Sequence, residues 1–273
     1  MRFKRGGIVF GKPFRVKFNK DGKMKYLTID TTTKVTALAL GENSKLVEEV
    51  FLDTGKTHSE RLVPMLHQLL EAAEWSLAEL DFIGVVRGPG SFTGIRIGIA
   101  TAQGLAQVLN IPLLGVLSLD VISWAGYAHG EDIAVILDAR KNEWYTAVYS
   151  WRGDSRRQIT GPCAKAPERL LAELQERGRK VLFAGDAAQA AETKILDIMD
   201  GQGVVLPRYQ ALPRGAYAVQ EVWSEYQQFQ IEGIELPAAV EPCYIRFSEA
   251  EVNYHKKMEQ MAGSEHILTK QRL

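Results

Sequence analysis

One glycine-rich segment, residues 87–96, has residue types and spacing that could do chemistry. Ser91 or Thr93 can cap a following helix with a side-chain oxygen, and the free N–H groups of that helix start can face an anion. Glycines in such a loop permit backbone conformations that other residues resist. The candidate anion-loop residues are Gly88, Pro89, Gly90, Ser91, Thr93, Gly94 and Arg96.

Two familiar phosphate motifs do not fit this loop. A Walker loop needs Lys followed by Ser or Thr after its glycines, and that pair is missing. The dinucleotide fingerprint needs a different glycine spacing and a ribose-binding acid. The pattern leaves two interpretations open, an anion site and a tight structural turn.

Two aspartates end predicted strands in corresponding places. Asp30 closes a run at 25–30, and Asp138 closes a run at 132–138. Each could coordinate magnesium, or each could cap the turn that follows it, which is the role favoured by turn chemistry. The repetition itself predicts a weak internal repeat.

The sequence offers no obvious metal ligands of another kind. Helical metal sites place two histidines four residues apart on one face, and no two of the five histidines have that spacing. Cys163 and Cys243 are far apart and lack the CxxC spacing, which argues against a zinc knuckle or a disulfide framework and fits a reducing compartment.

Hydrophobic patterning predicts the elements that hold these residues. Three short β-rich runs at 25–30, 35–41 and 45–52 indicate an antiparallel meander. A capping box of Thr57 and Glu60 predicts a helix over 57–75, in which Pro64 could introduce a kink. The elements expected next are a strand at 81–87, a helix at 94–109, a strand at 113–117 and a helix from Ser118.

The second half repeats this alternation. Strands are expected at 132–138, 143–151 and 180–184, and helices at 167–177, after Gly185 and at 215–229. We therefore predict an α/β protein with a first lobe over 24–128, a second lobe over 129–248 and a polar tail over 249–273.

Charge is unevenly distributed along the 273 residues. Residues 1–23 carry eight basic residues and one acid, which leaves 25 basic and 32 acidic residues in the rest and a net charge of −7 there. An acidic body repels phosphate backbones, so nucleic-acid binding by this chain alone is not expected. Residues 1–23 are interpreted as a disordered basic extension or a translated upstream region, with a start at Met24. No apolar run approaches the ~18 residues needed to span a bilayer.

Several of these segments together resemble the TsaB (YeaZ) family, a relative of TsaD and of the glycoprotease-type superfamily. The resemblance covers roughly 24–250 and is strongest over 80–120. The matching segments are Ile29–Thr31, Thr57–Glu60, Gly88–Gly98, Leu137–Arg140 and Glu241–Arg246. It implies the two-lobed fold of actin, sugar kinases and heat-shock-chaperone ATPases, each lobe built on a mixed sheet.

The resemblance also separates this chain from catalytic relatives. TsaD carries an HxxxH metal pair after the helix that follows its glycine loop, whereas residues 118–122 here contain no histidine. Kinases of this fold follow the first-lobe aspartate with glycine, whereas Thr31 follows Asp30. The resemblance therefore implies no tightly bound cofactor, with ATP and Mg²⁺ used by the complex rather than by this chain alone.

The helix at 94–109 has apolar residues on more than one face, whereas a helix lying on a sheet needs a single apolar stripe. The resemblance favours a partner interface on this helix and on the helix at 57–75. The candidate interface residues are Leu62, Val63, Leu66, Leu70, Ile95, Ile99, Ala102, Leu105 and Ala106.

The resulting hypothesis is a cytoplasmic, non-catalytic scaffold. It would pair with TsaD, with the ATPase TsaE also joining, in a complex that transfers a threonylcarbamoyl group to N6 of the adenosine beside the anticodon of tRNA. The chain would meet tRNA only through that complex and would have no membrane contact. A homodimer, a small-molecule kinase of the same fold and a metallopeptidase remain alternatives.

Overall fold

The computed structural model describes residues 22–54, 58–127 and 129–246. The expected basic extension, except its last two residues, and the expected tail after 248 lie outside this range, as does Thr57 of the expected capping box. The chain divides into two units after Cys243, and the two described sheets with their helices belong to the first unit.

The first sheet contains the predicted meander followed by two parallel strands. Its strands are β1 (Lys25–Asp30), β2 (Thr36–Glu42), β3 (Lys45–Leu52), β4 (Phe82–Val86) and β5 (Leu113–Val116). The order is β3-β2-β1-β4-β5, with β1 antiparallel to β2 and parallel to β4. Strands β1 and β4 are almost wholly buried because helices cover both faces.

The second sheet repeats this order. Its strands are β6 (Asp132–Asp138), β7 (Trp144–Arg152), β8 (Ser155–Lys165), β9 (Val181–Ala184) and β10 (Gly203–Val205). Read from its other edge, the order β8-β7-β6-β9-β10 matches the first sheet strand for strand. The predicted internal repeat and the two-lobed mixed-sheet fold are thus confirmed.

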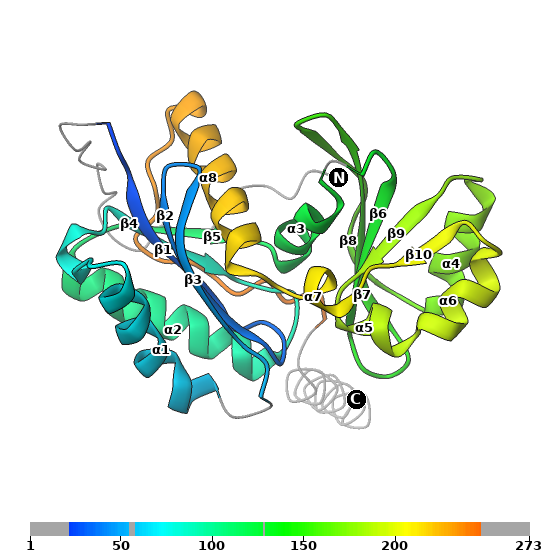
Figure 1. Ribbon diagram of the computed structural model, residues 1–273, viewed down its shortest axis with the longest axis horizontal. Coiled ribbons are helices and arrows are strands. Elements are labelled where there is room, and N and C mark those ends of the chain that lie inside the picture. The colour runs from blue at the N-terminus through cyan, green and yellow to red at the C-terminus, as the bar shows by residue number, and fades with distance from the viewer. Residues whose placement is uncertain (1–21, 55–57, 128, 247–273) are drawn as a thin grey trace, which may run out of the picture. The chain divides into compact units, whose positions relative to one another are not determined.

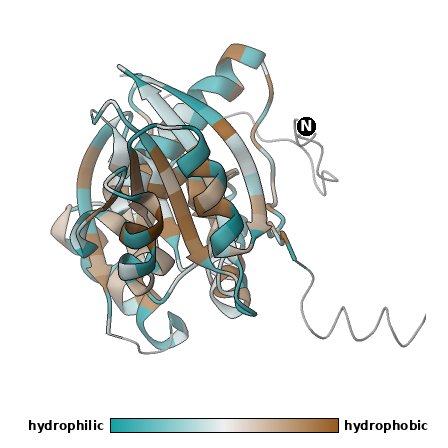
Figure 2. Ribbon diagram, turned by 90° about the vertical axis from the view of Figure 1, so that its right-hand side faces the viewer, coloured by the Kyte–Doolittle hydropathy of each residue, from teal (hydrophilic) through white to brown (hydrophobic). Residues whose placement is uncertain are grey.

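Helices cover the faces of these sheets (Figure 1). Those of the first half are α1 (His58–Ala72), α2 (Phe92–Leu109) and α3 (Ser118–Ile122), with 3-10 turns η1 (Leu77–Glu79) and η2 (Ser123–Gly126). Those of the second half are α4 (Pro167–Glu176), α5 (Asp186–Ala190), α6 (Glu192–Met199), α7 (Arg208–Ala211) and α8 (Gly215–Glu232). Helix α1 continues through Pro64. Figure 2 shows hydrophobic strands, in brown, among helices that carry both hydrophilic and hydrophobic residues.

Helix α8 corrects the predicted lobe boundary. It follows the second sheet in sequence, yet it packs on β1, β2, β3 and β5 of the first sheet. Val219, Val222 and Tyr226 join Phe82 in one buried cluster. The range 129–248 therefore is not one lobe, because its last helix covers a face of the first sheet that would otherwise expose apolar side chains to water.

Strands β8 and β10 have no counterpart in the sequence prediction. β8 contains Gly161, Pro162 and many polar residues, so its sequence pattern does not predict a strand. It lies at the edge of the sheet, where an unpaired proline nitrogen is tolerated.

Candidate functional site

The glycine loop joins β4 to α2, as predicted. Ser91 is the N-cap of α2, and its Oγ accepts a hydrogen bond from the Gly94 N–H at 3.2 Å. Gly88 has a φ of 105°, a conformation that side chains with a Cβ resist. Thr93 is exposed, and the exposed Arg96 lies over the Phe92 ring at 3.8 Å from its centroid.

This loop lies directly against the turn that follows β1. The Ser91 N–H donates to the Thr32 carbonyl at 2.6 Å, and the Thr31 hydroxyl donates to the Gly94 carbonyl at 2.7 Å. A Cβ on Gly90 would lie 2.2 Å from the Thr32 oxygen, and one on Gly94 would lie 2.0 Å from the Thr31 oxygen. The chain's own backbone therefore occupies the approach to these glycines, which favours the structural-turn interpretation over an anion site.

Asp30 is buried at the base of the same turn. Its Oδ1 accepts hydrogen bonds from the Thr32 N–H at 2.9 Å and the Thr32 hydroxyl at 2.7 Å, whereas Oδ2 has no hydrogen-bond partner. Burial raises the pKa of Asp30 to about 6, with the bonds from Thr32 opposing the shift. This geometry caps the turn, as the structural interpretation predicts.

The raised pKa of Asp30 gives the protein a testable pH dependence. The folded state holds this proton more tightly than the unfolded chain, so the contribution of Asp30 to stability is fully present below its unfolded pKa and is lost as pH rises through about 6. We expect the free energy of unfolding by urea to increase from pH 8 to pH 5, with Asp30 contributing roughly 1 kcal/mol of the increase. In the Asp30→Asn variant the free energy of unfolding should rise less between pH 8 and pH 5 than in the wild type. An equal rise in both proteins would contradict the assignment of this pH dependence to Asp30.

Asp138 occupies the corresponding position in the second sheet but is half exposed. Its Oδ1 accepts a hydrogen bond from the Arg140 N–H at 2.8 Å, which caps the β6–β7 turn. Its own N–H donates to Asp186 Oδ1 at 3.2 Å. The turn residues Arg140, Lys141 and Asn142 all have positive φ. Asp138 therefore has the turn-capping geometry, but its carboxylate is not buried as that of Asp30 is.

Within the described residues, no group of three or more His, Cys, Asp and Glu side chains has a geometry that could hold a metal ion. His58, at the start of α1, is engaged at both ring nitrogens. Nδ1 lies 2.7 Å from the Thr36 hydroxyl and Nε2 lies 2.9 Å from the Thr33 carbonyl. This histidine packs the helix start against the threonine-rich turn.

The structure divides the nine candidate interface residues. Only Val63 is well exposed, at 63%, and Leu105 is partly buried. The other seven lie in the core of this chain: Leu62, Leu66, Leu70, Ile95, Ile99, Ala102 and Ala106. In this fold those seven face the chain's own sheet, so they are not available to a partner. Ala102 is fully buried, so arginine at this position would unfold the chain rather than probe an interface.

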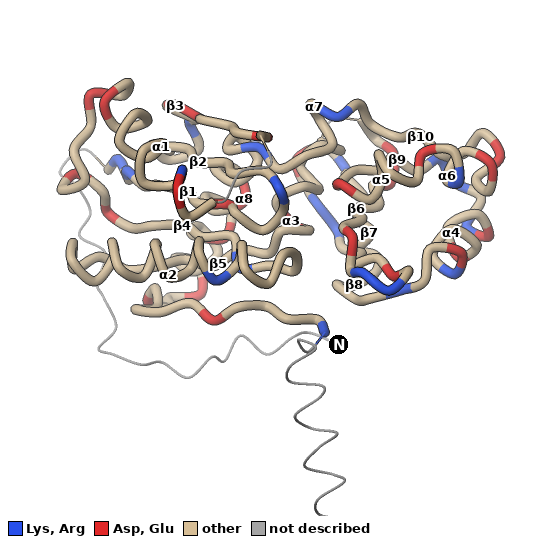
Figure 3. The backbone as a smooth tube through the Cα atoms, turned by 90° about the horizontal axis from the view of Figure 1, so that it is seen from below, with Lys and Arg blue, Asp and Glu red and all other residues tan. Residues whose placement is uncertain are grey.

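The outer face of α2 carries different residues. Arg96, Ala100, Gly104 and Val108 are exposed and recur every four residues, which places them in one stripe. Arg96 is the single charged residue of α2, which is otherwise uncharged along its length in Figure 3. Val108 is 85% exposed, and a Cβ on Gly104 would meet no atom within 4 Å. We call these four residues the α2 stripe.

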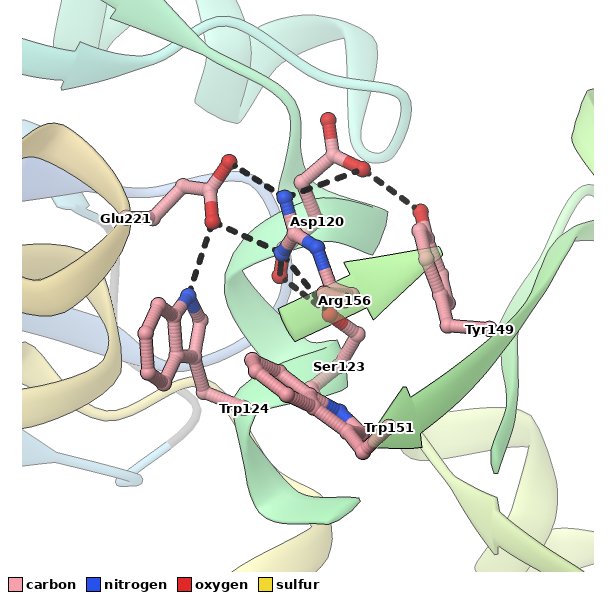
Figure 4. Close-up of polar contacts among 7 residues, drawn as sticks. All are labelled: Asp120, Ser123, Trp124, Tyr149, Trp151, Arg156 and Glu221. Atoms are coloured by element: carbon pink, nitrogen blue, oxygen red, sulfur yellow. Dashed lines mark hydrogen bonds and ion pairs between the residues drawn. The ribbon is translucent and has the colours of Figure 1, made fainter. Parts of the chain in front are cut away.

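A buried charge cluster connects α3, β7, β8 and α8 (Figure 4), and the sequence did not indicate it. The Arg156 guanidinium donates from both terminal nitrogens to the Glu221 carboxylate, at 2.7 and 2.8 Å. It also donates to the Asp120 carbonyl at 2.7 Å and lies 3.9 Å from Asp120 Oδ1. The Tyr149 hydroxyl donates to Asp120 Oδ1 at 2.8 Å.

The cluster has further neutral donors. The Trp124 indole N–H donates to Glu221 Oε2 at 2.7 Å, and the Trp151 indole N–H donates to the Ser123 carbonyl at 3.0 Å. Burial, together with the neighbouring charge of Glu221, raises the pKa of Asp120 to about 6. No sequence signal could have assembled these residues, because they come from five separate elements, α3, η2, β7, β8 and α8.

Comparisons with known proteins identify the family. The family model of TsaD, described as tRNA N6-adenosine threonylcarbamoyltransferase, matches residues 52–221. The tRNA threonylcarbamoyladenosine biosynthesis protein TsaB of Bacillus subtilis is 30% identical, over 85% of this chain and 98% of that protein. This chain belongs to the TsaB family. The TsaB of Haemophilus influenzae is 28% identical, over 81% of this chain and 92% of its own length.

Solved structures agree with the assignment to the TsaB family. YeaZ from Pseudomonas aeruginosa has a TM-score of 0.65 and 27% identity, and the match covers 81% of this chain and 99% of that one. A second P. aeruginosa structure, described as similar to peptidase YeaZ, has a TM-score of 0.67 at the same identity and covers 82% of this chain and all of that one.

In this TsaB-family chain, residues 118–122 form α3, the stretch where the resemblance implied that catalytic relatives carry their histidine pair. Here Asp120 contacts the Arg156 guanidinium, and the Ser118 hydroxyl donates to the Pro89 carbonyl at 2.5 Å. These contacts tie α3 to the glycine loop on one side and to the charge cluster on the other. No helix among the described residues is long and apolar enough to cross a membrane.

Proposed function

We propose that this chain is a non-catalytic scaffold subunit in the biosynthesis of threonylcarbamoyladenosine in tRNA, and that it pairs with a TsaD catalytic subunit in the cytoplasm. Membership of the TsaB family carries this proposal, because the B. subtilis relative named for this biosynthesis aligns with this chain over 98% of its own length. The transfer to N6 of the tRNA adenosine would then take place on TsaD, with ATP and Mg²⁺ used by the complex and TsaE joining it. This chain would hold no tightly bound cofactor and would meet tRNA only through that complex.

The glycine loop supports a scaffold rather than a kinase. Its approach is occupied by the Thr31 and Thr32 carbonyls at distances that leave no room even for a Cβ on Gly90 or Gly94. A kinase of this fold would need that approach for a phosphate. The loop instead fixes the start of α2 and thereby the orientation of the α2 stripe.

The α2 stripe is the surface that we assign to the partner. Ala100 and Gly104 are small, so another helix can approach the α2 backbone closely, and Val108 supplies apolar area at one end. Val63 adds exposed apolar area on α1, which contacts α2 (Figure 1). The same stripe suits a second copy of this chain, so self-association and TsaD binding should compete.

The Gly104→Arg variant tests this surface. The side chain enters open space and relieves the low helix propensity of glycine, so the variant should fold with at least wild-type stability. It should lower the affinity for TsaD at least about tenfold, because the arginine prevents close helix approach and its charge must be desolvated. Titration calorimetry with purified TsaD measures the affinity, and nucleoside analysis of tRNA from cells carrying only the variant measures the modification.

Gly161→Arg is the matched control. Gly161 also faces open space, and it lies on edge strand β8 of the second sheet, away from α2. Its replacement with arginine should therefore leave TsaD binding unchanged. Equal affinities for wild type and Gly104→Arg would remove the α2 stripe from the interface. Normal tRNA modification in cells lacking the chain altogether would overturn the proposed function itself.

A further inference from the structure

The Arg156 side chain links parts of the molecule that belong to different sheets. Arg156 comes from β8 of the second sheet, whereas its main acceptor Glu221 lies on α8, which packs on the first sheet. Asp120 on α3 lies beside both, and Tyr149 of β7 donates to it. The cluster in Figure 4 is therefore a contact between the β7–β8 hairpin and α8, with α3 lying against α8 and against β6 of the second sheet.

The charges in this contact do not balance. Asp120 and Glu221 place two carboxylates around one guanidinium, and their side chains are 21% and 6% exposed. An excess negative charge held largely out of water is costly, and it is removed most simply by one proton. Among the described residues, the titratable groups that act on Asp120 include Glu221 and Glu225 of α8, Tyr149 of β7, Arg156 of β8 and Cys243, which follows the last helix.

We propose that this cluster is a proton-operated latch, in which uptake of one proton by Asp120 strengthens the hold of α8 on the β7–β8 hairpin. With Asp120 neutral, the Arg156 guanidinium is balanced by Glu221 alone, and its two hydrogen bonds to that carboxylate remain. With Asp120 ionised, the second carboxylate repels Glu221 and weakens the contact. Because burial and Glu221 raise the pKa of Asp120 to about 6, the change falls in the mildly acidic range.

Solvent can deliver the proton. A cavity of about 250 Å³ adjoins the cluster and is lined by Trp124, Trp151, Asp154, Ser155, Arg156 and Ser224. This volume accommodates several waters, so the latch can equilibrate with the medium without unfolding.

Tryptophan fluorescence of the full-length protein reports on the latch directly. Trp124 donates to Glu221, and the Trp151 ring lies 4.9 Å from the Trp124 ring, so both indoles sense the charge state of the cluster. We expect a single fluorescence midpoint near pH 6 in a titration from pH 8 to pH 4.5. The Asp120→Asn variant should lose that midpoint.

Two further variants make the assignment specific. Asp30→Asn removes a carboxyl outside the cluster whose pKa is also raised to about 6, and it should leave the midpoint in place. Tyr149→Phe deletes the hydroxyl that stabilises ionised Asp120, so it should move the midpoint to higher pH. The Tyr149→Phe variant also tests the proposal if the Asp120→Asn protein does not fold.

Hydrogen exchange then measures how strongly the cluster holds the β7–β8 hairpin against local opening. After correction for the intrinsic rate, amides of the β7–β8 hairpin and α3 should exchange roughly tenfold more slowly at pH 5 than at pH 8 in the wild type. In Asp120→Asn this ratio should fall to that of amides in the first sheet, which respond to Asp30 and not to the cluster. A midpoint that survives Asp120→Asn or disappears in Asp30→Asn would overturn the proposal. Hairpin exchange that does not change with pH would overturn it too.

Discussion

Replacement of Arg156 with alanine is expected to lower the free energy of unfolding by about 3 kcal/mol or more. The guanidinium makes four hydrogen bonds within the cluster, and its loss would leave the carboxylates of Glu221 and Asp120 close together without a counter-charge. Removing one partner of a buried ion pair costs more than the pair itself contributes, because the remaining charge stays desolvated. Urea unfolding at pH 8 measures the loss.

A double variant separates charge from packing. Arg156→Met combined with Glu221→Gln keeps apolar volume and leaves an amide oxygen to accept from the Trp124 indole, but it removes both charges. We expect it to lose less stability than Arg156→Ala alone. At pH 5 the loss in Arg156→Ala should shrink, because Asp120 is then largely protonated. An Arg156→Ala protein as stable as the wild type would show that the cluster contributes little to the free energy of folding.

Replacement of Gly90 with valine is the second large effect, expected to cost about 3 kcal/mol or more. A Cβ at this position would lie 2.2 Å from the Thr32 carbonyl oxygen, which is backbone and cannot rotate away. Relief of that overlap would pull apart the hydrogen bond from the Ser91 N–H to the same oxygen. Because this contact fixes the start of α2, partner binding should fall together with stability.

Gly161→Val is the control for the same change of residue in open space, and it should leave the midpoint of urea unfolding close to that of the wild type. Circular dichroism during urea titration compares the two variants. A Gly90→Val protein of normal stability and normal TsaD binding that had lost affinity for a phosphate compound would restore the anion-site interpretation of the loop.

The sequence by itself determined the local elements and the family. The meander at β1–β3, the strand–glycine loop–helix unit and the paired aspartates were predicted from alternation, from turn residues and from capping chemistry, and these depend on neighbours in the chain. The Ser91 cap is of this kind, because a serine oxygen three residues from an N–H needs no tertiary contact to form. The matched segments of the TsaB family are local patterns too.

Tertiary structure alone decided which faces are buried and which distant residues meet. Helix α2 has apolar residues on several sides, and only its packing against the sheet shows that Ile95 and Ala102 face inward while Val108 faces water. Helix α8 follows the second sheet in sequence but packs on the first sheet, because the first sheet has a second apolar face that must be covered. The charge cluster brings Asp120, Arg156 and Glu221 together across 36 and 65 residues of sequence, because two repeated sheets fold against a shared set of helices and not because of any local pattern.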